Sequence, residues 1–374
     1  MAATHNPMQA STSLPAVSKT TIHMYGLLCD VYGLEELATQ KPSAVSCLWL
    51  HHPRLRAKED MADFANRVVS QWAQRTSGSR TGSGATSTGG RALIAVAFDQ
   101  RNHGSRIVSP TASDSWREGN KTHALDMYGM VSGMVSDTQA LMDVVEGYIK
   151  LEVSERGAVA VEEGWGVDQH LVMGVSLGGH SAWQTLFKEE KVTAGVVIIG
   201  CPDYMALLSD RAKKSRLATF SAADNGASFL GSKDFPADLV AACLRNDPKG
   251  ILFGTGTVPA SSKSTAQSSS LSVSEEQRLR GVLDSLHLKG KKFLVCSGAD
   301  DKLVPYAMSE PFVSFFEEAT RTWYADAEIM VENKVYDGVG HAFSEGMVED
   351  SCQFLLDAVA AAGDAAGSES KAKI

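Results

Sequence analysis

Short apolar runs rich in β-branched residues alternate along this chain with longer stretches whose apolar residues recur at helical spacing. Buried parallel strands read as continuous apolar runs, and the segment AGVVIIG at 194–200 is an example. This alternation predicts β-α units built around a mostly parallel sheet flanked by helices, an α/β fold. Strands are predicted at residues 21–28, 45–50, 92–98, 171–175, 194–200, 292–296 and 328–336. Helices are predicted at residues 58–74, 135–149, 177–189, 308–320 and 347–361.

Three stretches interrupt the alternation. Residues 76–91 are rich in Gly and Ser, and residues 261–274 are rich in Ser, so both are predicted to be mobile surface segments. Residues 202–287 show no strand of the sheet but carry helical patterns at 204–212 and 237–246, which predicts an inserted helical cap. The predicted organisation is a flexible N-terminus at 1–20, a core in two parts at 21–201 and 288–362, the cap at 202–287, and a flexible tail at 363–374.

Composition narrows the class of protein. The 374 residues are 44% hydrophobic and 21% charged, which is typical of a globular chain. The formal net charge of -9 argues against a nucleic-acid partner, because such partners select basic surfaces. No apolar run approaches the ~20 residues that a membrane-spanning helix needs. The first 20 residues lack the apolar segment of a secretory signal.

The cysteines and the C-terminus bear on location. Six cysteines are scattered and no pair forms C-x-x-C, which favours buried, reduced thiols over disulfides or a zinc site. We therefore predict an intracellular, cytoplasmic protein. The last three residues, Ala372-Lys373-Ile374, resemble a peroxisomal signal of the S-K-L type with two replacements, so peroxisomal import is an alternative to a plain unstructured terminus. Nothing in the sequence indicates an oligomeric state.

The strongest candidate for chemistry is Ser176. It lies in Gly174-Val175-Ser176-Leu177-Gly178, directly after the predicted strand 171–175 and directly before the predicted helix 177–189. Glycines on both sides are needed because Cβ atoms there would collide with the neighbouring strand and helix. With this context the G-x-S-x-G pattern resembles the nucleophile elbow of the α/β-hydrolase superfamily, which implies the α/β-hydrolase fold and a catalytic serine at Ser176.

The resemblance also implies an acid and a histidine later in the chain, in that order. The predicted strand at 292–296 is followed by Ser297-Gly298-Ala299-Asp300-Asp301-Lys302-Leu303-Val304-Pro305, which resembles the superfamily pattern G-x-x-D-x-x-V-P. That spacing selects Asp301 and leaves Asp300 as a turn residue. Asp203 is a rival acid because some members carry the carboxylate after the preceding strand, but a helix N-cap is the preferred interpretation of Asp203. Of ten histidines, only His341 lies between the last predicted strand and the last predicted helix.

An acyl-transfer site also needs donors for the oxyanion. The resemblance implies the backbone N–H of Leu177 as one of them. Superfamily members often have His-Gly after the strand at 45–50, whereas this chain has His51-His52-Pro53-Arg54. The second donor would fall on Pro53, which has no N–H, or on Arg54, and we favour Arg54.

Four further segments are interpreted as structural or left open. Residues 99–105 (DQRNHGS) resemble the D-x-R-G-x-G-x-S turn of the superfamily, which implies a structural role for His103. His180 is expected to pack or cap the helix after Ser176. Residues 116–127 and 200–204 are similar to fungal α/β-hydrolase-like proteins. Residues 116–127 could border a pocket or pack on the surface, and both interpretations remain open.

These residues predict a serine hydrolase that cleaves a carboxylic ester or thioester of a small apolar substrate through an acyl-enzyme. Ser176 would be the nucleophile, His341 the base and Asp301 the acid, with no metal or organic cofactor. The same residues are compatible with an acyltransferase, a lactonase, an amidase or a carbon–carbon bond hydrolase. A non-catalytic α/β-hydrolase scaffold that binds a small ligand is the alternative from a different class.

Overall fold

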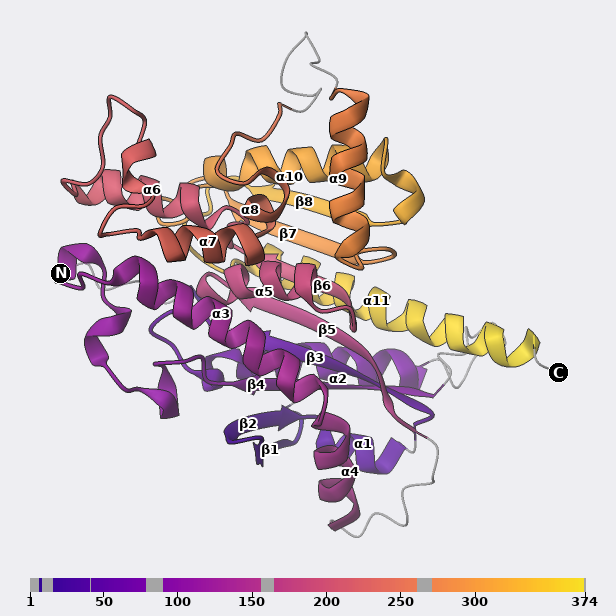
Figure 1. Ribbon diagram of the computed structural model, residues 1–374. Coiled ribbons are helices and arrows are strands. Elements are labelled where there is room, and N and C mark those ends of the chain that lie inside the picture. The colour runs from indigo at the N-terminus through magenta and orange to yellow at the C-terminus, as the bar shows by residue number, and fades with distance from the viewer. Residues whose placement is uncertain are drawn as a thin grey trace.

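One eight-stranded sheet organises the computed structural model, which describes residues 7–8, 16–40, 42–78, 90–155, 165–260 and 271–372 (Figure 1). The strands are β1 (Lys19–Met24), β2 (Leu27–Tyr32), β3 (Ala44–His51), β4 (Arg91–Phe98), β5 (Val167–Val175), β6 (Val192–Ile198), β7 (Lys292–Gly298) and β8 (Met330–Tyr336). The α-helices are α1 (Leu34–Gln40), α2 (Ala62–Gly78), α3 (His123–Met142), α4 (Val145–Glu155), α5 (Leu177–Lys188), α6 (Tyr204–Ser215), α7 (Ala237–Asn246), α8 (Pro248–Phe253), α9 (Val273–Ser285), α10 (Tyr306–Arg321) and α11 (Glu345–Ala372).

The order of the strands across the sheet is β1-β2-β4-β3-β5-β6-β7-β8. Strand β2 pairs antiparallel with both β1 and β4, and every other pair from β4 to β8 is parallel. A mostly parallel sheet with this order, flanked by helices and carrying helices α6 to α9 between β6 and β7, is the α/β-hydrolase fold. The predicted fold class is therefore confirmed.

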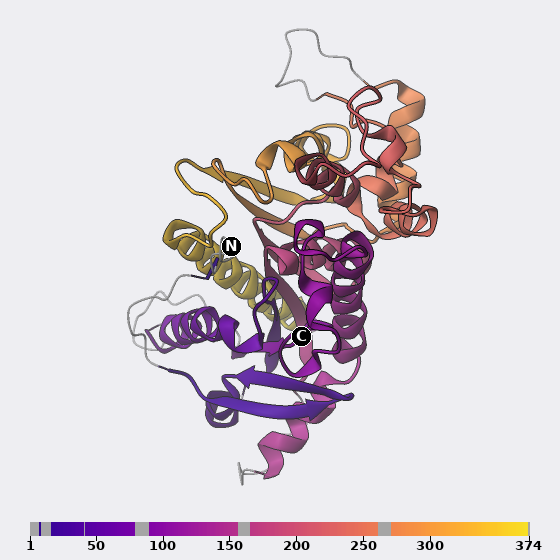
Figure 2. The same ribbon diagram turned by 90° about the vertical axis from the view of Figure 1, so that its left-hand side faces the viewer.

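Helices cover both faces of the sheet, which explains why its central strands are apolar throughout. Helices α2 and α11 pack with one set of strand side chains, including Leu48, Leu50 and Leu171. Helices α3, α4, α5 and α10 pack with the alternate set on the other face, including Trp49 and Val172. Figure 2 views the sheet nearly edge-on, with α2 and the yellow α11 on one side and α3 on the other. A strand that is buried on both faces needs apolar residues at every position.

A third apolar cluster lies at the carboxyl ends of the strands. It joins α6 and α7 to the first turns of α3, and it includes Leu177 after β5 and Val304 after β7. Two tyrosine hydroxyls fasten these helices to each other: Tyr204 donates to the Ala124 carbonyl (2.7 Å) and Tyr128 donates to the Ala242 carbonyl (2.9 Å). The segment between β6 and β7 therefore covers the end of the sheet where α/β folds bind ligands.

The N-terminal strand prediction was wrong in one respect, because residues 21–28 do not form a single strand. The chain reverses at Tyr25 and Gly26, both with positive φ (52° and 86°), and β1 and β2 form a hairpin. Positive φ at both central residues is the requirement of the tight hairpin turn. Hairpin turns of this kind usually contain Asn-Gly or Asp-Gly, whereas this one contains Tyr-Gly. The turn was therefore not recognised within the apolar run. Likewise, the helix predicted at 135–149 is divided between α3 and α4.

The structure describes part of both chain ends, and the flexibility predicted for 1–20 and 363–374 stays a prediction. Within the described N-terminal residues, the Pro7 carbonyl accepts the Phe343 N–H (2.7 Å), and Met8 pairs with Phe343 in a β-bridge. Helix α11 continues to Ala372, well past the predicted end at 361. Residues 360–366 are mostly alanine, the strongest helix former, which accounts for the extension. The proposed targeting residues Lys373 and Ile374, and most of 76–91 and 261–274, lie outside the described residues.

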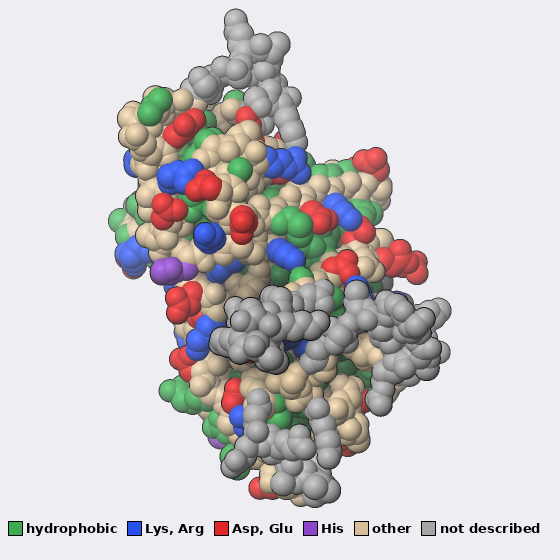
Figure 3. Space-filling model, turned by 90° about the vertical axis from the view of Figure 1, so that its right-hand side faces the viewer, with side chains coloured by type: hydrophobic (Ala, Val, Ile, Leu, Met, Phe, Trp, Pro, Cys, Tyr) green, Lys and Arg blue, Asp and Glu red, His purple; other side chains and the backbone are tan. Residues whose placement is uncertain are grey.

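Surface charge, helix hydropathy and cysteine burial each bear on what the composition predicts. In Figure 3, acidic and basic side chains are interspersed over the upper part of the visible face. Among the described helices, none is long and apolar enough to cross a membrane. All six cysteines are buried and unpaired by disulfides.

One buried histidine connects the sheet to two helices. His51, the last residue of β3, is fully buried, with Nδ1 2.9 Å from the Ser181 hydroxyl on α5 and Nε2 3.0 Å from the Thr138 hydroxyl on α3. Burial, and to a smaller extent His52, lowers the pKa of His51 to about 3. The folded protein therefore holds this imidazole neutral at a pH where the unfolded chain would protonate it.

We expect acid to destabilise the fold through His51. A folded-state pKa below the unfolded value means that the stabilisation is present above pH ~6.5 and is lost as the pH falls toward 3. Between pH 7 and pH 5 this amounts to about 2 kcal/mol for one histidine. Urea unfolding of wild type and His51→Gln at both pH values measures it, and the variant should show a smaller pH dependence. His23→Gln, at an exposed position on β1, is the control. Identical pH dependence in wild type and His51→Gln would contradict the prediction.

Candidate active site

Ser176 lies on the sharp turn between β5 and α5. Its backbone has φ 55° and ψ −111°, a conformation that a residue with a side chain rarely adopts and that turns the hydroxyl away from the strand. A Cβ on Gly174 would overlap the carbonyl of Gly178, and a Cβ on Gly178 would overlap the carbonyl of His51. The two glycines therefore let the first turn of α5 lie directly against the ends of β3 and β5, which forces the strained conformation at Ser176.

His341 lies in the loop between β8 and α11, and its ring reaches Ser176. The distance from His341 Nε2 to Ser176 Oγ is 2.8 Å, and the distance from His341 Nδ1 to Asp301 Oδ2 is 2.7 Å. Because an ionised carboxylate can only accept, Nδ1 carries the proton in this arrangement and Nε2 is free to accept the serine proton. The structure thus brings Ser176, His341 and Asp301 together in one hydrogen-bonded chain.

Asp301 is held in the turn that follows β7. Its second oxygen, Oδ1, accepts the backbone N–H groups of Leu303 (2.8 Å) and Val304 (2.9 Å). The side chain is only 1% exposed, so no solvent competes for either oxygen. The N–H of the neighbouring Asp300 donates to the Val339 carbonyl (2.9 Å), which ties this turn to the loop that carries His341.

The other two acids considered from the sequence are placed differently. Asp300 is exposed, and its role here is the backbone bond to the histidine loop. Asp203 caps α6, where its carboxylate accepts the Ala206 N–H (2.9 Å) and lies 3.7 Å from the Lys249 ammonium. The structure therefore gives Asp203 the N-cap position that was preferred for it.

Leu177 and Arg54, the two candidate oxyanion donors, both have an available backbone N–H. Leu177 is the first residue of α5, so its N–H has no partner within the helix. The Arg54 N–H donates to no residue in the part of the chain that the structure describes. The carbonyl of His51 lies against Gly178, so the loop that contains Arg54 starts beside the first turn of α5. The choice of Arg54 over Pro53 stays a prediction.

The loop from His51 to Arg54 is fixed by a glutamine that the sequence did not single out. The Gln100 N–H donates to His52 Nε2 (3.0 Å), and the Gln100 side chain donates to the His52 carbonyl. Burial lowers the pKa of His52 to about 4, so its ring is a neutral acceptor. The loop lacks the glycine that is common at this place in the superfamily. Its conformation is instead held by the hydrogen bonds between Gln100 and His52.

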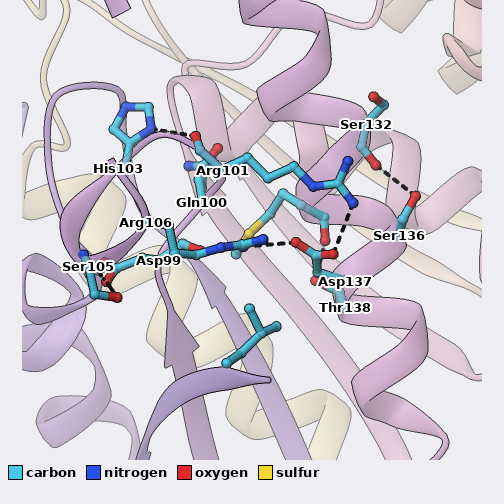
Figure 4. Close-up of polar contacts among 12 residues, drawn as sticks. Asp99, Gln100, Arg101, His103, Ser105, Arg106, Ser132, Ser136, Asp137 and Thr138 are labelled. Carbon is cyan, nitrogen blue, oxygen red and sulfur yellow. Dashed lines mark hydrogen bonds and ion pairs between the residues drawn. The ribbon is translucent and has the colours of Figure 1, made fainter. Parts of the chain in front are cut away.

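The segment that includes His103 has a structural role. Asp99 accepts the N–H and the hydroxyl of Ser105 (2.9 and 2.8 Å), which closes the turn. Figure 4 shows Arg101 and Arg106 converging on Asp137 of α3, at 3.1 and 2.8 Å. The same figure shows the His103 ring bonded to the Arg101 carbonyl (3.0 Å).

His180, one turn after Ser176, is fully enclosed. Its Nδ1 accepts the Cys201 N–H (2.9 Å), which fastens α5 to the segment after β6. Burial lowers the pKa of His180 to about 3, and the charge of Arg211 contributes. Its packing role agrees with the expectation.

Arg211 on α6 is a second residue near the site that sequence reasoning missed. Its Nη1 lies 2.9 Å from the Met127 sulfur, and its charge acts on Asp301 and His180. The sequence does contain a sign of it. Arg211 is a charged residue at helical spacing from Tyr204, Leu207 and Leu208, which form the buried face of α6. Within the described ranges, no group of three or more His, Cys, Asp or Glu side chains is arranged to bind a metal ion.

Comparison with known proteins gives distant structural similarity only. No protein-family model matches the chain, and no curated protein matches it in sequence. It is similar to an S-formylglutathione hydrolase from Agrobacterium tumefaciens (15% identity, TM-score 0.47, covering 92% of this chain and 93% of that one). It is also similar to esterase B from Lactobacillus rhamnosis (12%, 0.47, covering 95% and 89%) and to an esterase from Pyrococcus furiosus (15%, 0.42, covering 94% and 95%). At such low identities and scores we draw no function from them.

A substitution that adds one methyl group at Gly178 tests the close contact between this residue and the His51 backbone. We expect Gly178→Ala to destabilise the fold by about 1–3 kcal/mol, because the added Cβ meets the His51 backbone, which cannot move aside as a side chain would. Gly281→Ala is the matched control, since a Cβ there meets nothing within 4 Å on an exposed helical position, and it should stabilise by up to about 1 kcal/mol. Thermal and urea unfolding measure both. Equal stability of the two variants would refute the role of this contact.

Proposed function

We propose that this protein is a serine hydrolase that cleaves a carboxylic ester or thioester through an acyl-enzyme. The observation that carries the proposal is the continuous chain from Asp301 through His341 to Ser176, with bonds of 2.7 and 2.8 Å, ending at a serine on a strained strand-to-helix turn. A free serine hydroxyl is a poor nucleophile, and a base in hydrogen-bond contact, itself oriented by a carboxylate, supplies the activation.

In the proposed reaction, Ser176 Oγ attacks the ester carbonyl while His341 Nε2 takes the serine proton. The oxyanion that forms would accept the Leu177 N–H and the Arg54 N–H. The imidazolium then protonates the leaving alcohol or thiol, which leaves an acyl group on Ser176. Water attacks that acyl group with His341 as the base, and the acid is released.

The surroundings of Asp301 explain how it could serve this reaction. Two backbone N–H groups and the imidazole satisfy its oxygens, so the carboxylate is fixed in orientation beside the imidazole. A buried, ionised partner stabilises the positive charge that develops on His341. The apolar cluster around Leu177 and Val304 lowers the local polarity and supports an apolar body for the substrate.

Covalent labelling tests the nucleophile. A fluorophosphonate probe should label wild type and should not label Ser176→Ala, because the probe requires an activated serine. The variant should also lose hydrolysis of 4-nitrophenyl butyrate, by roughly 10⁴-fold or more. Its unfolding midpoint, measured in parallel, shows that the fold is intact. Labelling of Ser176→Ala to the extent of wild type would rule out this assignment.

The neighbouring residues Asp300 and Asp301 allow a matched pair of variants that tests which of them is the catalytic acid. In Asp301→Asn, the side-chain amide would donate toward His341 Nδ1 and favour the tautomer that cannot accept the serine proton. We expect kcat to fall by roughly 10⁴-fold. Asp300→Asn removes the same charge one residue earlier but keeps the backbone bond to Val339, and kcat should change less than about threefold. Steady-state ester hydrolysis distinguishes them, and a greater loss in Asp300→Asn would contradict the assignment.

A further inference from the structure

A positively charged side chain occupies the inner stripe of α6. The stripe runs through Tyr204, Leu207 and Leu208, which are buried, and continues one turn later at Arg211. An apolar residue is expected at such a position. Arg211 instead directs Nη1 to the sulfur of Met127, a weak acceptor, and its Nε is buried without any partner among the described residues.

A second guanidinium, that of Arg54, lies close enough for the two charges to act on each other. Arg54 Nη1 donates to the Ser113 carbonyl (2.6 Å), in the segment that leads into α3. Within this segment, Glu118 accepts the Ser115 N–H (2.9 Å), and the His123 ring bonds to the Asp114 carbonyl (2.8 Å). The Ser113 carbonyl thus ties Arg54 to the segment that leads into residues 116–127, for which the sequence left both a pocket border and surface packing open.

Neither guanidinium has an acid partner within 4 Å in the described part of the chain. Burial and the charge of Arg54 lower the pKa of Arg211 to about 10, and burial lowers the pKa of Arg54. The acids that act on them from farther away are Glu118, Asp114 and Asp301. Asp301 already bonds to His341, and Glu118 to Ser115. Both side chains are partly buried. Charges that lose part of their hydration are normally paired, so two neighbouring arginines without a carboxylate within 4 Å are a costly arrangement.

A third donor lies beside this pair. The indole Nε1 of Trp116 is buried and has no hydrogen-bond partner among the described residues. Its ring packs against His123, with ring centroids 4.9 Å apart, and His123 senses the charges of both arginines. Arg54 bonds to Ser113, and Trp116 packs against the apolar cluster that contains Met127, the residue that Arg211 contacts. The three donors therefore belong to one region of the protein, where a group rich in acceptor oxygens can satisfy them.

We propose that the guanidinium groups of Arg54 and Arg211, with the indole of Trp116, bind an anionic oxygen group of the substrate. The inference rests on the proposed function and narrows its substrate class to an ester with an apolar body and a carboxylate or phosphate. The planar arginine fork matches both groups in a bidentate manner. The backbone N–H of Arg54 is a candidate oxyanion donor. If it binds the reacting carbonyl, the guanidinium of the same residue is no farther from that carbonyl than the length of the arginine side chain.

Paired substrates test whether the anion matters and in which half of the ester it lies. For an anion in the acyl half, 4-nitrophenyl hydrogen glutarate is compared with neutral 4-nitrophenyl pentanoate. For a phosphate in the alcohol half, 1-butyrylglycerol 3-phosphate is compared with 1-butyrylglycerol. One of the charged esters should show a kcat/KM roughly 10- to 100-fold above its neutral counterpart, the range for charge-assisted hydrogen bonds. Equal values in both pairs would overturn the inference.

The ratio of charged to neutral kcat/KM assigns the effect to the arginines, because the neutral ester is an internal reference in each variant. In Arg211→Met the ratio should fall toward one, and in Arg211→Lys it should fall only in part, since a charge remains without the fork. Arg216→Met removes an equal charge from an exposed position at the end of α6 and should keep the wild-type ratio. A ratio unchanged in Arg211→Met, or lost equally in Arg216→Met, would refute the site.

A binding measurement separates this inference from the proposed function. Glutarate or inorganic phosphate at millimolar concentration should raise the unfolding temperature of wild type and of Ser176→Ala, but not that of Arg211→Met. Stabilisation without hydrolysis of any ester would support the anion site and contradict the proposed function. Hydrolysis of neutral esters, with neither charge preference nor stabilisation by these anions, would support the proposed function and overturn the anion site.

Discussion

The contact between the first turn of α5 and the ends of β3 and β5 is the constraint on which the site depends. Backbone meets backbone at Gly174, Gly178 and His51, with no side chain between them. Because the helix starts so close to the strand, Ser176 must take a positive φ and turn its hydroxyl outward. The same closeness leaves the Leu177 N–H free at the start of the helix and places the loop before Arg54 beside it. One packing requirement therefore orients the serine and also leaves the Leu177 N–H without a partner in the helix.

The local contact positions only Ser176, and the parallel sheet brings His341 and Asp301 to it. Ser176 and His341 are 165 positions apart in the chain, and His341 and Asp301 are 40 apart. Their loops follow β5, β8 and β7, and parallel strands end at the same edge of a sheet. Short backbone bonds between the loops, such as the one from Asp300 to Val339, then fix the distances. Sheet order brings the three side chains into one region, and loop bonds set their geometry.

Sequence reasoning succeeded where a pattern is local and periodic. The alternation of apolar runs and helical stretches predicted the fold class, and the glycine spacing predicted the turn at Ser176. It failed where one run holds two elements, as at the Tyr25-Gly26 hairpin turn, and where alanine continues a helix beyond its predicted end, as in α11. Arg211 shows a different limit: a charge on an apolar stripe is visible in the sequence. That it lies beside Arg54, about 157 positions earlier, follows only from tertiary packing.

Under the proposed function, the groups that carry out the chemistry and the groups that select the substrate belong to different parts of the fold. The serine, histidine and aspartate belong to loops of the sheet, which the fold holds in place whatever the substrate. Arg211, Arg54 and Trp116 belong to the insertion after β6, the loop after β3 and the segment before α3, elements that a fold can vary without disturbing its core. Placing two arginines together without a carboxylate lowers the stability of the empty protein. Binding of the proposed anion would offset that cost, which would explain why the arrangement persists beside the proposed ester-cleaving site.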